Sequence, residues 1–214
     1  MVNSLINQRG LASMIKCLSQ GGVEDVAVLD AFQKTPRHLF VDPAVQDSAY
    51  RDITLPIGYQ QTISQPSLVG KMLQTVREGK RFNRVLEIGA GSGFQTALLS
   101  HLANRVFAIE RIKDLVEIAL GRFSSLGLDN IHLKHADGLL GWPEEGAFDA
   151  IVMGAYSSEL SLGLLSQLTN GGRFIAPVGS AYDQDLVLVK RENNKFVRQK
   201  IAKVKFVPAL SGIR

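Results

Sequence analysis

The chain has 214 residues, of which 45% are hydrophobic and 21% charged, and its formal net charge at pH 7 is +4. This length suits one domain with a sizeable core. The mild charge, without a dense basic run beside aromatic residues, argues against a nucleic-acid-binding protein. No apolar stretch approaches the roughly 18 residues that a membrane helix requires, and residues 1–25 lack a signal-peptide core. With one cysteine, Cys17, and so no internal disulfide, we expect a cytoplasmic protein without membrane or nucleic-acid partners.

Short helices are predicted for the start of the chain. Residues 4–19 carry apolar side chains at helical spacing, and the glycine pair 21–22 ends the pattern. A second helix is predicted for residues 23–34, because the residue before Pro36 avoids the α region. Residues 36–41 predict one further turn of helix. The inward-facing residues that we expect after the first helix are Val26, Leu29, Phe32, Leu39 and Phe40.

Residues 51–67 read RDITLPIGYQQTISQPS and carry little helical signal. A polar stretch of this length within a compact chain is more often functional than idle. Pro66 then starts an amphipathic helix, as proline favours the first helical turn. Ser64 and Gln65 therefore lie beside a helix N-terminus, where the backbone N–H groups can hold an anionic group. A helix-capping role for Ser64 is the structural alternative.

A strand, a glycine turn, a helix and a second strand follow one another in residues 84–110. Val85–Ile88 is a short apolar run typical of a buried strand, and Gln95–Leu102 has an apolar face at helical spacing. Val106–Ile109 is a second apolar strand, and Glu110 closes it. Such a unit holds a nucleotide-like cofactor beside the carboxyl ends of parallel strands.

The spacing of the glycines distinguishes between cofactors. The turn contains Gly89, Gly91 and Gly93. A dinucleotide fingerprint needs a third small residue where this chain has Phe94, so the spacing disfavours NAD. With Glu87 at its head, the turn instead resembles the S-adenosylmethionine turn of class I methyltransferases, in which an acid such as Glu110 accepts both ribose hydroxyls. A glycine turn without a ligand is the alternative.

The rest of the chain continues the alternation of strands and helices. The expected elements are a helix at 112–123, strands at 130–134 and 148–153, a helix at 160–168 ended by the glycine pair 171–172, a strand at 173–177, and an antiparallel pair at 185–190 and 196–206. This alternation predicts an α/β fold with a doubly wound, mainly parallel sheet and an antiparallel C-terminal edge. Asp137 follows the third strand, where its carboxylate could accept a hydrogen bond from an adenine amine or cap the turn before Gly138.

Blocks of sequence along nearly the whole chain resemble the protein-L-isoaspartate (D-aspartate) O-methyltransferase family. They are PRHLFVD at 36–42, LPIGYQQTISQPSLVGKML at 55–73, RVLEIGAGSGFQTALLSHL at 84–102, VFAIERI at 106–112, HADGLLGWP at 135–143, FDAIVM at 148–153, GGRFIAPVG at 171–179 and VKFVP at 204–208. The resemblance implies a Rossmann-like class I methyltransferase fold as one domain, with N-terminal helices and a substrate loop in 1–80 and the cofactor-binding core in 81–214.

The same resemblance implies the residues of the site. Ser64, in QTISQP, would be the active-site serine at the acceptor carboxylate. The implied contacts of S-adenosylmethionine are Glu87, Gly89, Gly91, Ser92, Gly93, Glu110, Arg111, Asp137 and Gly138. The implied substrate contacts are Ile63, Gln65, Ala155 and Val207. We predict no metal, because His132 and His135 have no cysteine or clustered carboxylate beside them.

The implied reaction is methyl transfer from S-adenosylmethionine to the free carboxylate of L-isoaspartyl and D-aspartyl residues in damaged proteins. A free carboxylate has a pKa of about 4, so it is ionised at pH 7 and needs no general base. Ser64 would orient the carboxylate by a hydrogen bond. The resulting ester would close to a succinimide, which hydrolyses partly to normal aspartate. We expect damaged proteins and peptides as the partners of a monomeric enzyme.

One block departs from the family pattern. Residues 153–161 read MGAYSSELS, so that Ser157 and Ser158 replace two prolines and Tyr156 is bulky. Ser67 also replaces an aromatic residue or histidine of many relatives. Because this segment lies near the acceptor in the family, a carboxyl methyltransferase with a dedicated peptide substrate stays open as one alternative. The other is a non-catalytic relative that binds the cofactor or a partner protein.

Overall fold

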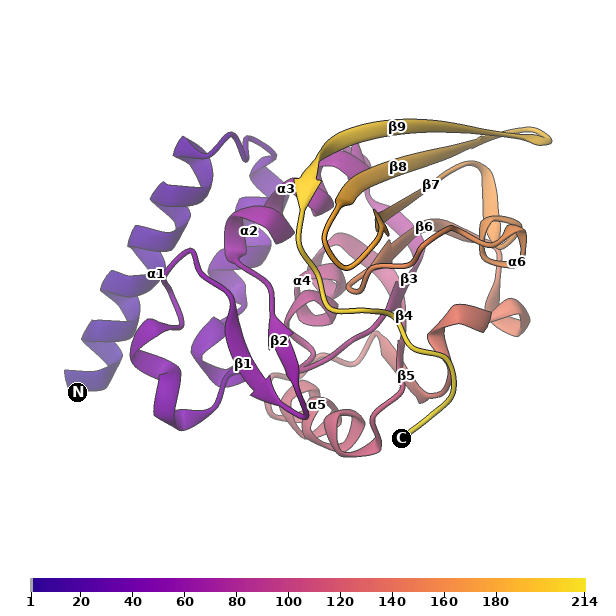
Figure 1. Cartoon of the computed structure of the whole chain (residues 1–214). Coiled ribbons are helices and arrows are strands. Elements are labelled where there is room, and N and C mark those ends of the chain that lie inside the picture. The colour runs from indigo at the N-terminus through magenta and orange to yellow at the C-terminus, as the bar shows by residue number, and fades with distance from the viewer. Residues whose placement is uncertain (1) are drawn as a thin grey trace.

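Seven strands form the main sheet of the molecule (Figure 1). The computed structural model describes residues 2–214, and side chains from residue 7 onward. The strands are β3 (Phe82–Ile88), β4 (Ala103–Glu110), β5 (Ile131–His135), β6 (Phe148–Met153), β7 (Leu168–Gly179), β8 (Gln184–Glu192) and β9 (Lys195–Val204). In the order β5-β4-β3-β6-β7-β8-β9, the neighbours from β5 to β7 are parallel and the last two pairs are antiparallel. The predicted sheet with its antiparallel C-terminal edge is confirmed.

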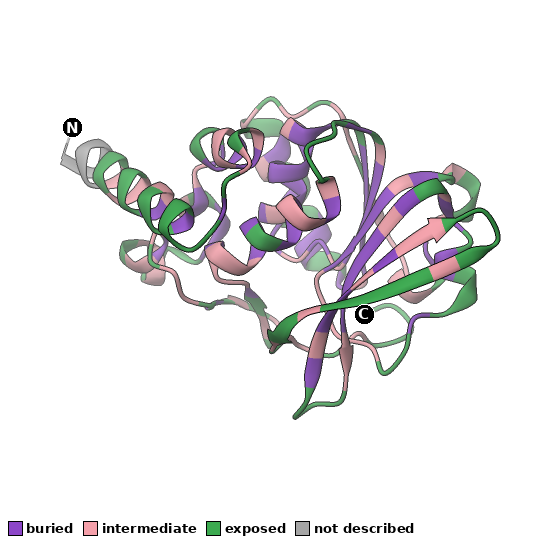
Figure 2. Cartoon of the chain, turned by 90° about the horizontal axis from the view of Figure 1, so that it is seen from above, coloured by how far each residue is buried: buried purple, intermediate pink, exposed green. Residues whose placement is uncertain are grey.

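Two hydrophobic clusters lie on opposite faces of this sheet. Because strand side chains alternate between the faces, Val85 of β3 joins the first cluster and Leu86 the second. The helices of the first cluster are α1 (Val2–Gln20), α2 (Val26–Lys34), α3 (Pro66–Arg77), α4 (Phe94–Leu102) and α5 (Lys113–Ser125). The short α6 (Leu162–Leu165) packs on the other face. Buried residues concentrate in the central strands, whereas β9 is largely exposed (Figure 2).

The start of α2 differs from the sequence prediction. Asp25 is the N-cap, and its side chain accepts hydrogen bonds from the backbone N–H groups of Ala27 and Val28 at 3.0 and 3.3 Å. Val26 is thus the first helical residue, and it is 78% exposed, so our inward placement of Val26 is wrong. The buried face of α2 consists of Val28, Ala31 and Phe32.

The expected turn at residues 36–41 is a 3-10 helix, Arg37–Phe40, and it buries a different pair of residues from the one predicted. Residues three apart eclipse one another in a 3-10 helix, so Arg37 and Phe40 share the inner face and both are fully buried. Leu39 is 39% exposed, and its predicted place in the core is wrong. Arg37, a charged residue, is therefore buried in this turn in place of the apolar Leu39 that the sequence predicted.

The polar stretch 51–67 contains a β-hairpin that the sequence did not predict. Strand β1 (Leu55–Gly58) pairs antiparallel with β2 (Gln61–Ile63), and Tyr59 and Gln60 form the two-residue turn at φ 53° and 60°. Two positive φ values favour Asn-Gly at such a turn, and Tyr-Gln gives no comparable signal. Figure 1 shows this hairpin between α1 and the main sheet. Ile57 and Gln61 of the hairpin line one cavity together with Gly89 and Glu110, at the carboxyl ends of β3 and β4.

The segment after β6 is also less helical than predicted. Only Leu162–Leu165 is helical, with Ser161 as its N-cap, and residue 168 already begins β7. The glycine pair 171–172 lies inside β7, where the register against β6 shifts, instead of ending a helix. A Cβ at Gly172 would lie 2.9–3.0 Å from the carbonyls of Thr169 and Phe148, so this irregularity requires glycine. Within residues 2–214, no helix combines the length and apolar character needed to cross a bilayer.

Candidate functional site

The glycine turn lies at the carboxyl end of β3, next to the end of β4. Gly89, Gly91 and Gly93 have φ values of +84°, +55° and +89°, which L side chains rarely adopt. A Cβ at Gly93 would also lie 2.7 Å from the ring of Phe123. The backbone N–H of Gly89 donates to the carbonyl of Ile109 at 2.8 Å, which ties the turn to β4. The turn therefore presents bare backbone to the space above the sheet.

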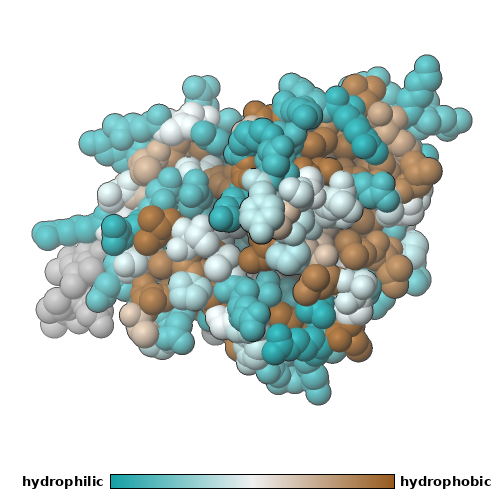
Figure 3. All heavy atoms as spheres, viewed as in Figure 1, coloured by the Kyte–Doolittle hydropathy of each residue, from teal (hydrophilic) through white to brown (hydrophobic). Residues whose placement is uncertain are grey.

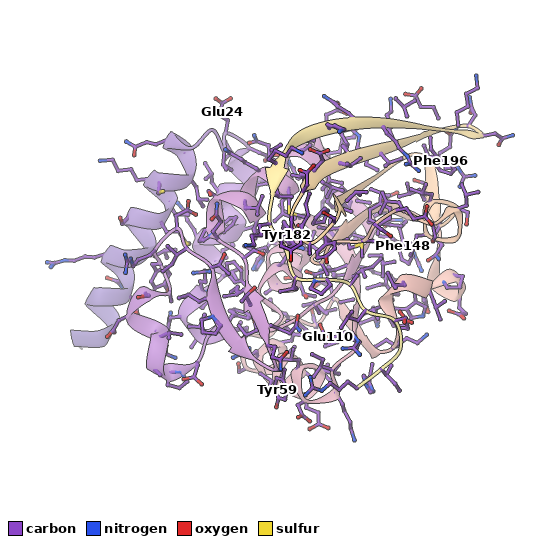
Figure 4. All side chains as sticks on the ribbon, viewed as in Figure 1. Glu24, Tyr59, Glu110, Phe148, Tyr182 and Phe196 are labelled. Atoms are coloured by element: carbon purple, nitrogen blue, oxygen red, sulfur yellow. The ribbon has the colours of Figure 1, made fainter. Side chains whose placement is uncertain are left out.

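Glu110 is the last residue of β4, and its side chain is hydrogen-bonded to the glycine turn. Its side chain is buried, with Oε2 accepting from the Gly91 N–H at 2.8 Å and Oε1 from the Ile112 N–H at 2.9 Å. Each carboxylate oxygen has a second lone pair, so Glu110 can accept two further hydrogen bonds. Figure 4 shows Glu110 close to the hairpin tip that Tyr59 marks.

A cavity, here called the cofactor cavity, opens beside Glu110 and the glycine turn. Its walls come from the hairpin, the carboxyl ends of the strands and the segment after β9. They are formed by Ile57, Gln61, Thr62, Ile88, Gly89, Gly91, Ile109, Glu110, Arg111, Ile112, Gly138, Leu139, Gly154, Ala155, Val207, Pro208, Ala209 and Leu210. Apolar and hydrophilic residues are interspersed over this face of the molecule (Figure 3).

Glu87 is the acid at the head of the turn, and it is almost fully buried. Its carboxyl accepts hydrogen bonds from Gln95 Nε2 at 2.9 Å and from Thr96 Oγ1 at 2.5 Å. Burial raises the pKa of Glu87 to about 8, although these two hydrogen bonds oppose the shift. Glu87 borders a second cavity, here called the central cavity, whose other walls are Thr62, Ile63, Ser64, Val69, Gly89, Ala90, Gly91, Ser92, Phe94, Gln95 and Gly154.

Ser64 follows the hairpin and precedes α3. The N-cap of α3 is Gln65, and no hydrogen bond between described residues uses the Ser64 hydroxyl. Ser64 lines the central cavity and also a surface groove, here called the acceptor groove. The groove is formed by Thr54, Thr62, Ser64, Gln65, Leu68, Gly154, Lys203, Val204, Lys205, Phe206 and Val207. Ser64 therefore borders both spaces.

The three cavities adjoin one another at two residues that the sequence analysis did not select. Thr62 and Gly154 line the cofactor cavity, the central cavity and the acceptor groove. Gly154 N–H donates to the Ile88 carbonyl at 2.8 Å, and a Cβ there would lie 3.0 Å from the Gly89 carbonyl. Thr62 is part of QTISQP, and Gly154 is the second residue of the segment 153–161 that departs from the family pattern, so both lie inside motifs already noted.

Asp137 contacts main chain on two sides. Its Oδ1 accepts from the Leu139 N–H at 2.9 Å and its Oδ2 from the Gly212 N–H at 2.6 Å. Arg111 Nε donates to the Gly212 carbonyl at 3.2 Å. These contacts fix Gly212, just after residues 207–210 in the wall of the cofactor cavity, which also includes Gly138 and Leu139. The capping contact anticipated for Asp137 is present, and its predicted contact with adenine stays a prediction.

The remaining predicted residues lie around the same three spaces. Ser92 and Ile63 line the central cavity, Gln65 the acceptor groove, Ala155 the cofactor cavity, and Val207 both the groove and the cofactor cavity. The departing segment is also tied to this region, because Tyr156 N–H donates to the Val207 carbonyl at 2.8 Å. Among residues 2–214, no group of three or more His, Cys, Asp or Glu side chains could hold a metal ion.

Comparisons with known proteins find relatives over nearly the whole chain. The chain is 44% identical over 209 residues to the protein-L-isoaspartate O-methyltransferase of Hahella chejuensis, covering 98% of this chain and 99% of that protein. It is 46% identical over 206 residues to the enzyme of the same name from Aromatoleum aromaticum, covering 96% and 94%.

Solved structures show the same relationship at lower identity. A protein-L-isoaspartate O-methyltransferase superposes with a TM-score of 0.85 and 28% identity, over 95% of this chain and 67% of that chain. A putative protein-L-isoaspartate O-methyltransferase from Plasmodium falciparum, in complex with S-adenosyl-L-homocysteine, superposes with a TM-score of 0.81 and 26% identity, over 92% and 97%. The family model of protein-L-isoaspartate(D-aspartate) O-methyltransferase matches residues 9–214, and the chain belongs to this family.

Proposed function

We propose that this protein transfers a methyl group from S-adenosylmethionine to the side-chain or main-chain carboxylate that is free in L-isoaspartyl and D-aspartyl residues of damaged proteins. The observation that carries the proposal is the meeting of three cavities at Thr62 and Gly154, with Ser64 in the walls of two of them. The glycine turn borders one side of this junction and an open groove the other. A cofactor and a peptide can therefore meet there.

The residues of the cofactor cavity fit S-adenosylmethionine. The bare backbone at Gly89 and Gly91 allows close approach of a ligand, and the free lone pairs of Glu110 suit a pair of ribose hydroxyls. When bound, S-adenosylmethionine supplies a methyl group on a positively charged sulfonium. We assign Glu87, Ser92, Gly93, Arg111, Asp137 and Gly138 to the surroundings of the same cofactor.

Ser64 has the role of orienting the acceptor. An ionised carboxylate accepts a hydrogen bond from the Ser64 hydroxyl, and the N-terminus of α3 beside it favours negative charge. No proton has to be removed from an acceptor that is ionised at pH 7. Alignment and exclusion of water therefore provide the catalysis, and proximity can contribute several kcal/mol, on the order of 7 or more. The substrate contacts that we assign are Ile63, Gln65, Ala155 and Val207.

The methyl ester produced is an activated acyl group. The backbone nitrogen of the following residue attacks its carbonyl, methanol leaves, and the succinimide that forms hydrolyses partly to a normal aspartyl bond. These later steps need no group of this protein. The protein therefore initiates a repair and does not complete it.

The organisation of the chain remains part of the proposal. We infer that residues 1–80 supply helices and the acceptor loop, that residues 81–214 supply the cofactor core, and that both form one domain. We also propose a monomer located in the cytoplasm. Light scattering of the purified protein tests the monomer, since a dimeric mass would contradict it.

Initial rates on paired peptides test the activity. One peptide carries isoaspartate and the other aspartate at the same position, with identical flanking residues. We expect base-labile methyl incorporation only with the isoaspartyl peptide. Equal incorporation into both peptides would contradict the preference for isoaspartate. Incorporation into neither, while S-adenosylmethionine binds, would contradict the proposal and favour the dedicated-peptide or the non-catalytic alternative.

A further inference from the structure

Arg37 is fully buried, and its guanidinium donates hydrogen bonds to the backbone at both ends of the β1–β2 hairpin. Its Nη2 donates to the Ile53 carbonyl at 3.1 Å and to the Ser64 carbonyl at 3.0 Å, and its Nη1 donates to the Ala49 carbonyl. Ile53 precedes β1 and Ser64 follows β2. One planar guanidinium therefore holds together the entry and the exit of the hairpin.

No ion pair accounts for this buried charge. Among the ion pairs of the described residues, Arg37 has none, and its buried Nε has no hydrogen-bond partner. Burial lowers the pKa of Arg37 to about 10, opposed by attraction to Asp52, so the side chain is charged at neutral pH. Asp52 itself accepts from the Ser67 N–H at 2.8 Å. A well-packed apolar side chain is often as stabilising as a buried ion, so stability alone is a weak reason for an arginine here.

Arg37 also contacts α4, the helix that follows the glycine turn. Its guanidinium carbon lies 5.7 Å from the ring centroid of Phe94, the first residue of α4 after Gly93. Phe94 is held in turn by edge contacts with Phe32 and Phe40, at centroid distances of 5.9 and 5.5 Å. Arg37 thus contacts both the segment that carries Ser64 and the helix that begins at the glycine turn.

We propose that Arg37 is a positioning residue that fixes Ser64 relative to the glycine turn. This inference rests on the proposed function, because the separation that it fixes is that between the acceptor carboxylate and the methyl donor. Arg37 acts through the backbone of the hairpin ends. Methyl transfer requires close alignment, so a small shift of Ser64 lowers turnover more than it lowers binding.

The experiment compares two variants. Arg37→Lys keeps the positive charge but lacks the planar guanidinium, and Arg37→Met removes the charge and all the N–H donors. The matched control is Arg77→Met. Arg77 is also mostly buried with an unpartnered Nε, but it pairs with Asp25 at the far end of α3, about 16 Å along the helix from Pro66. For each variant we measure kcat and KM with an isoaspartyl peptide, affinity for S-adenosylhomocysteine, melting temperature, and hydrogen exchange of residues 53–65.

We expect kcat per folded molecule to fall about tenfold or more in Arg37→Met and by a smaller factor in Arg37→Lys. The affinity for S-adenosylhomocysteine should change less than about threefold, because the glycine turn and Glu110 keep their contacts. Exchange of residues 53–65 should speed up in both variants. Arg77→Met should lower the melting temperature and leave kcat unchanged.

Wild-type kcat in the folded Arg37 variants, with a lowered melting temperature only, would show that Arg37 is a structural residue and overturn the inference. Unchanged exchange of residues 53–65 would overturn it as well. If Arg37→Met does not fold, Arg37→Lys decides by the same two readouts. If the wild type transfers no methyl group to isoaspartyl peptides, the proposed function fails, and hydrogen exchange still decides whether Arg37 fixes the hairpin.

Discussion

At the scale of single residues, Ser64 is the group whose role is most open to direct test. Ser64→Ala should keep the fold and the affinity for S-adenosylmethionine, because the hydroxyl makes no hydrogen bond to a described residue. We expect kcat on an isoaspartyl peptide to fall by about tenfold or more, equivalent to about 1.4 kcal/mol of transition-state stabilisation. Steady-state kinetics on the folded variant measures this loss.

Ser161→Ala is the matched control for Ser64. The Ser161 hydroxyl caps α6 by accepting from the Leu164 N–H at 3.2 Å, on the other face of the sheet. Its removal should lower the free energy of unfolding by about 1 kcal/mol and leave kcat unchanged. If Ser64→Ala shows this pattern instead, Ser64 does not orient the acceptor.

Glu110 should contribute to both cofactor binding and the shape of the glycine turn. Glu110→Ala removes the acceptor for the Gly91 and Ile112 N–H groups as well as the proposed ribose contacts. We expect calorimetry to show S-adenosylmethionine bound more weakly by about 1.5–3 kcal/mol, typical of hydrogen bonds to a charged group. Unchanged affinity in a folded variant would remove Glu110 from the cofactor site.

The buried carboxyl of Glu87 gives a prediction for pH. Its pKa is raised from 4.5 to about 8 in the folded state, so between these values the folded state binds more protons than the unfolded state. The contribution of Glu87 to the free energy of unfolding is therefore fully present below pH 4.5 and is lost as the pH rises toward 8. The free energy of unfolding falls by no more than about 1.4 kcal/mol per pH unit over this range.

Glu87→Gln should flatten this dependence, because the amide cannot ionise but can still accept from Gln95 and donate to Thr96. Chemical denaturation at pH 5 and pH 8 measures the free energy of unfolding of both proteins. The variant should gain stability relative to the wild type at the higher pH. A parallel pH dependence in the two proteins would show that Glu87 is ionised in the folded state.

At the scale of elements, residues 207–210 form one wall of the cofactor cavity, and Asp137 contacts Gly212 just beyond them. Asp137→Asn leaves a single acceptor oxygen for the Leu139 and Gly212 N–H groups, so one of these contacts is lost. We expect faster hydrogen exchange at Gly212 and cofactor binding weaker by about 0.5–1.5 kcal/mol, the net worth of one hydrogen bond. A variant that loses thermal stability but keeps full cofactor affinity would limit Asp137 to a capping role.

The elements that the sequence predicted well are those with long, regular hydrophobic patterns. The strand β6 has the predicted bounds and α3 starts at the predicted Pro66. The strands β3 and β4 contain the predicted apolar runs, and each begins three residues earlier than predicted. The elements that it missed depend on local backbone geometry. The β1–β2 turn uses Tyr-Gln at positive φ, and the 3-10 turn at Arg37–Phe40 changes which residues face inward.

At the scale of the whole molecule, the site is assembled from segments that are distant in the sequence. The glycine turn and Glu110 were predictable, because one local motif contains them. Thr62 and Gly154 gain their role only from the meeting of the hairpin with the end of β6, and the Arg37 contacts depend on tertiary packing. Charge and spacing along the chain carry no signal for such contacts, so only the folded structure brings them out.

The conversion of an isoaspartyl peptide to its aspartyl form tests the central claim most directly. The wild-type protein is incubated with S-adenosylmethionine and the peptide, and both peptide isomers and released methanol are quantified over time by chromatography. We predict that the isoaspartyl isomer declines, that methanol accompanies each cycle, and that the aspartyl isomer accumulates, with no change when S-adenosylhomocysteine replaces the methyl donor. Persistence of the isoaspartyl isomer without any methyl ester, in protein that binds S-adenosylmethionine, would contradict the account.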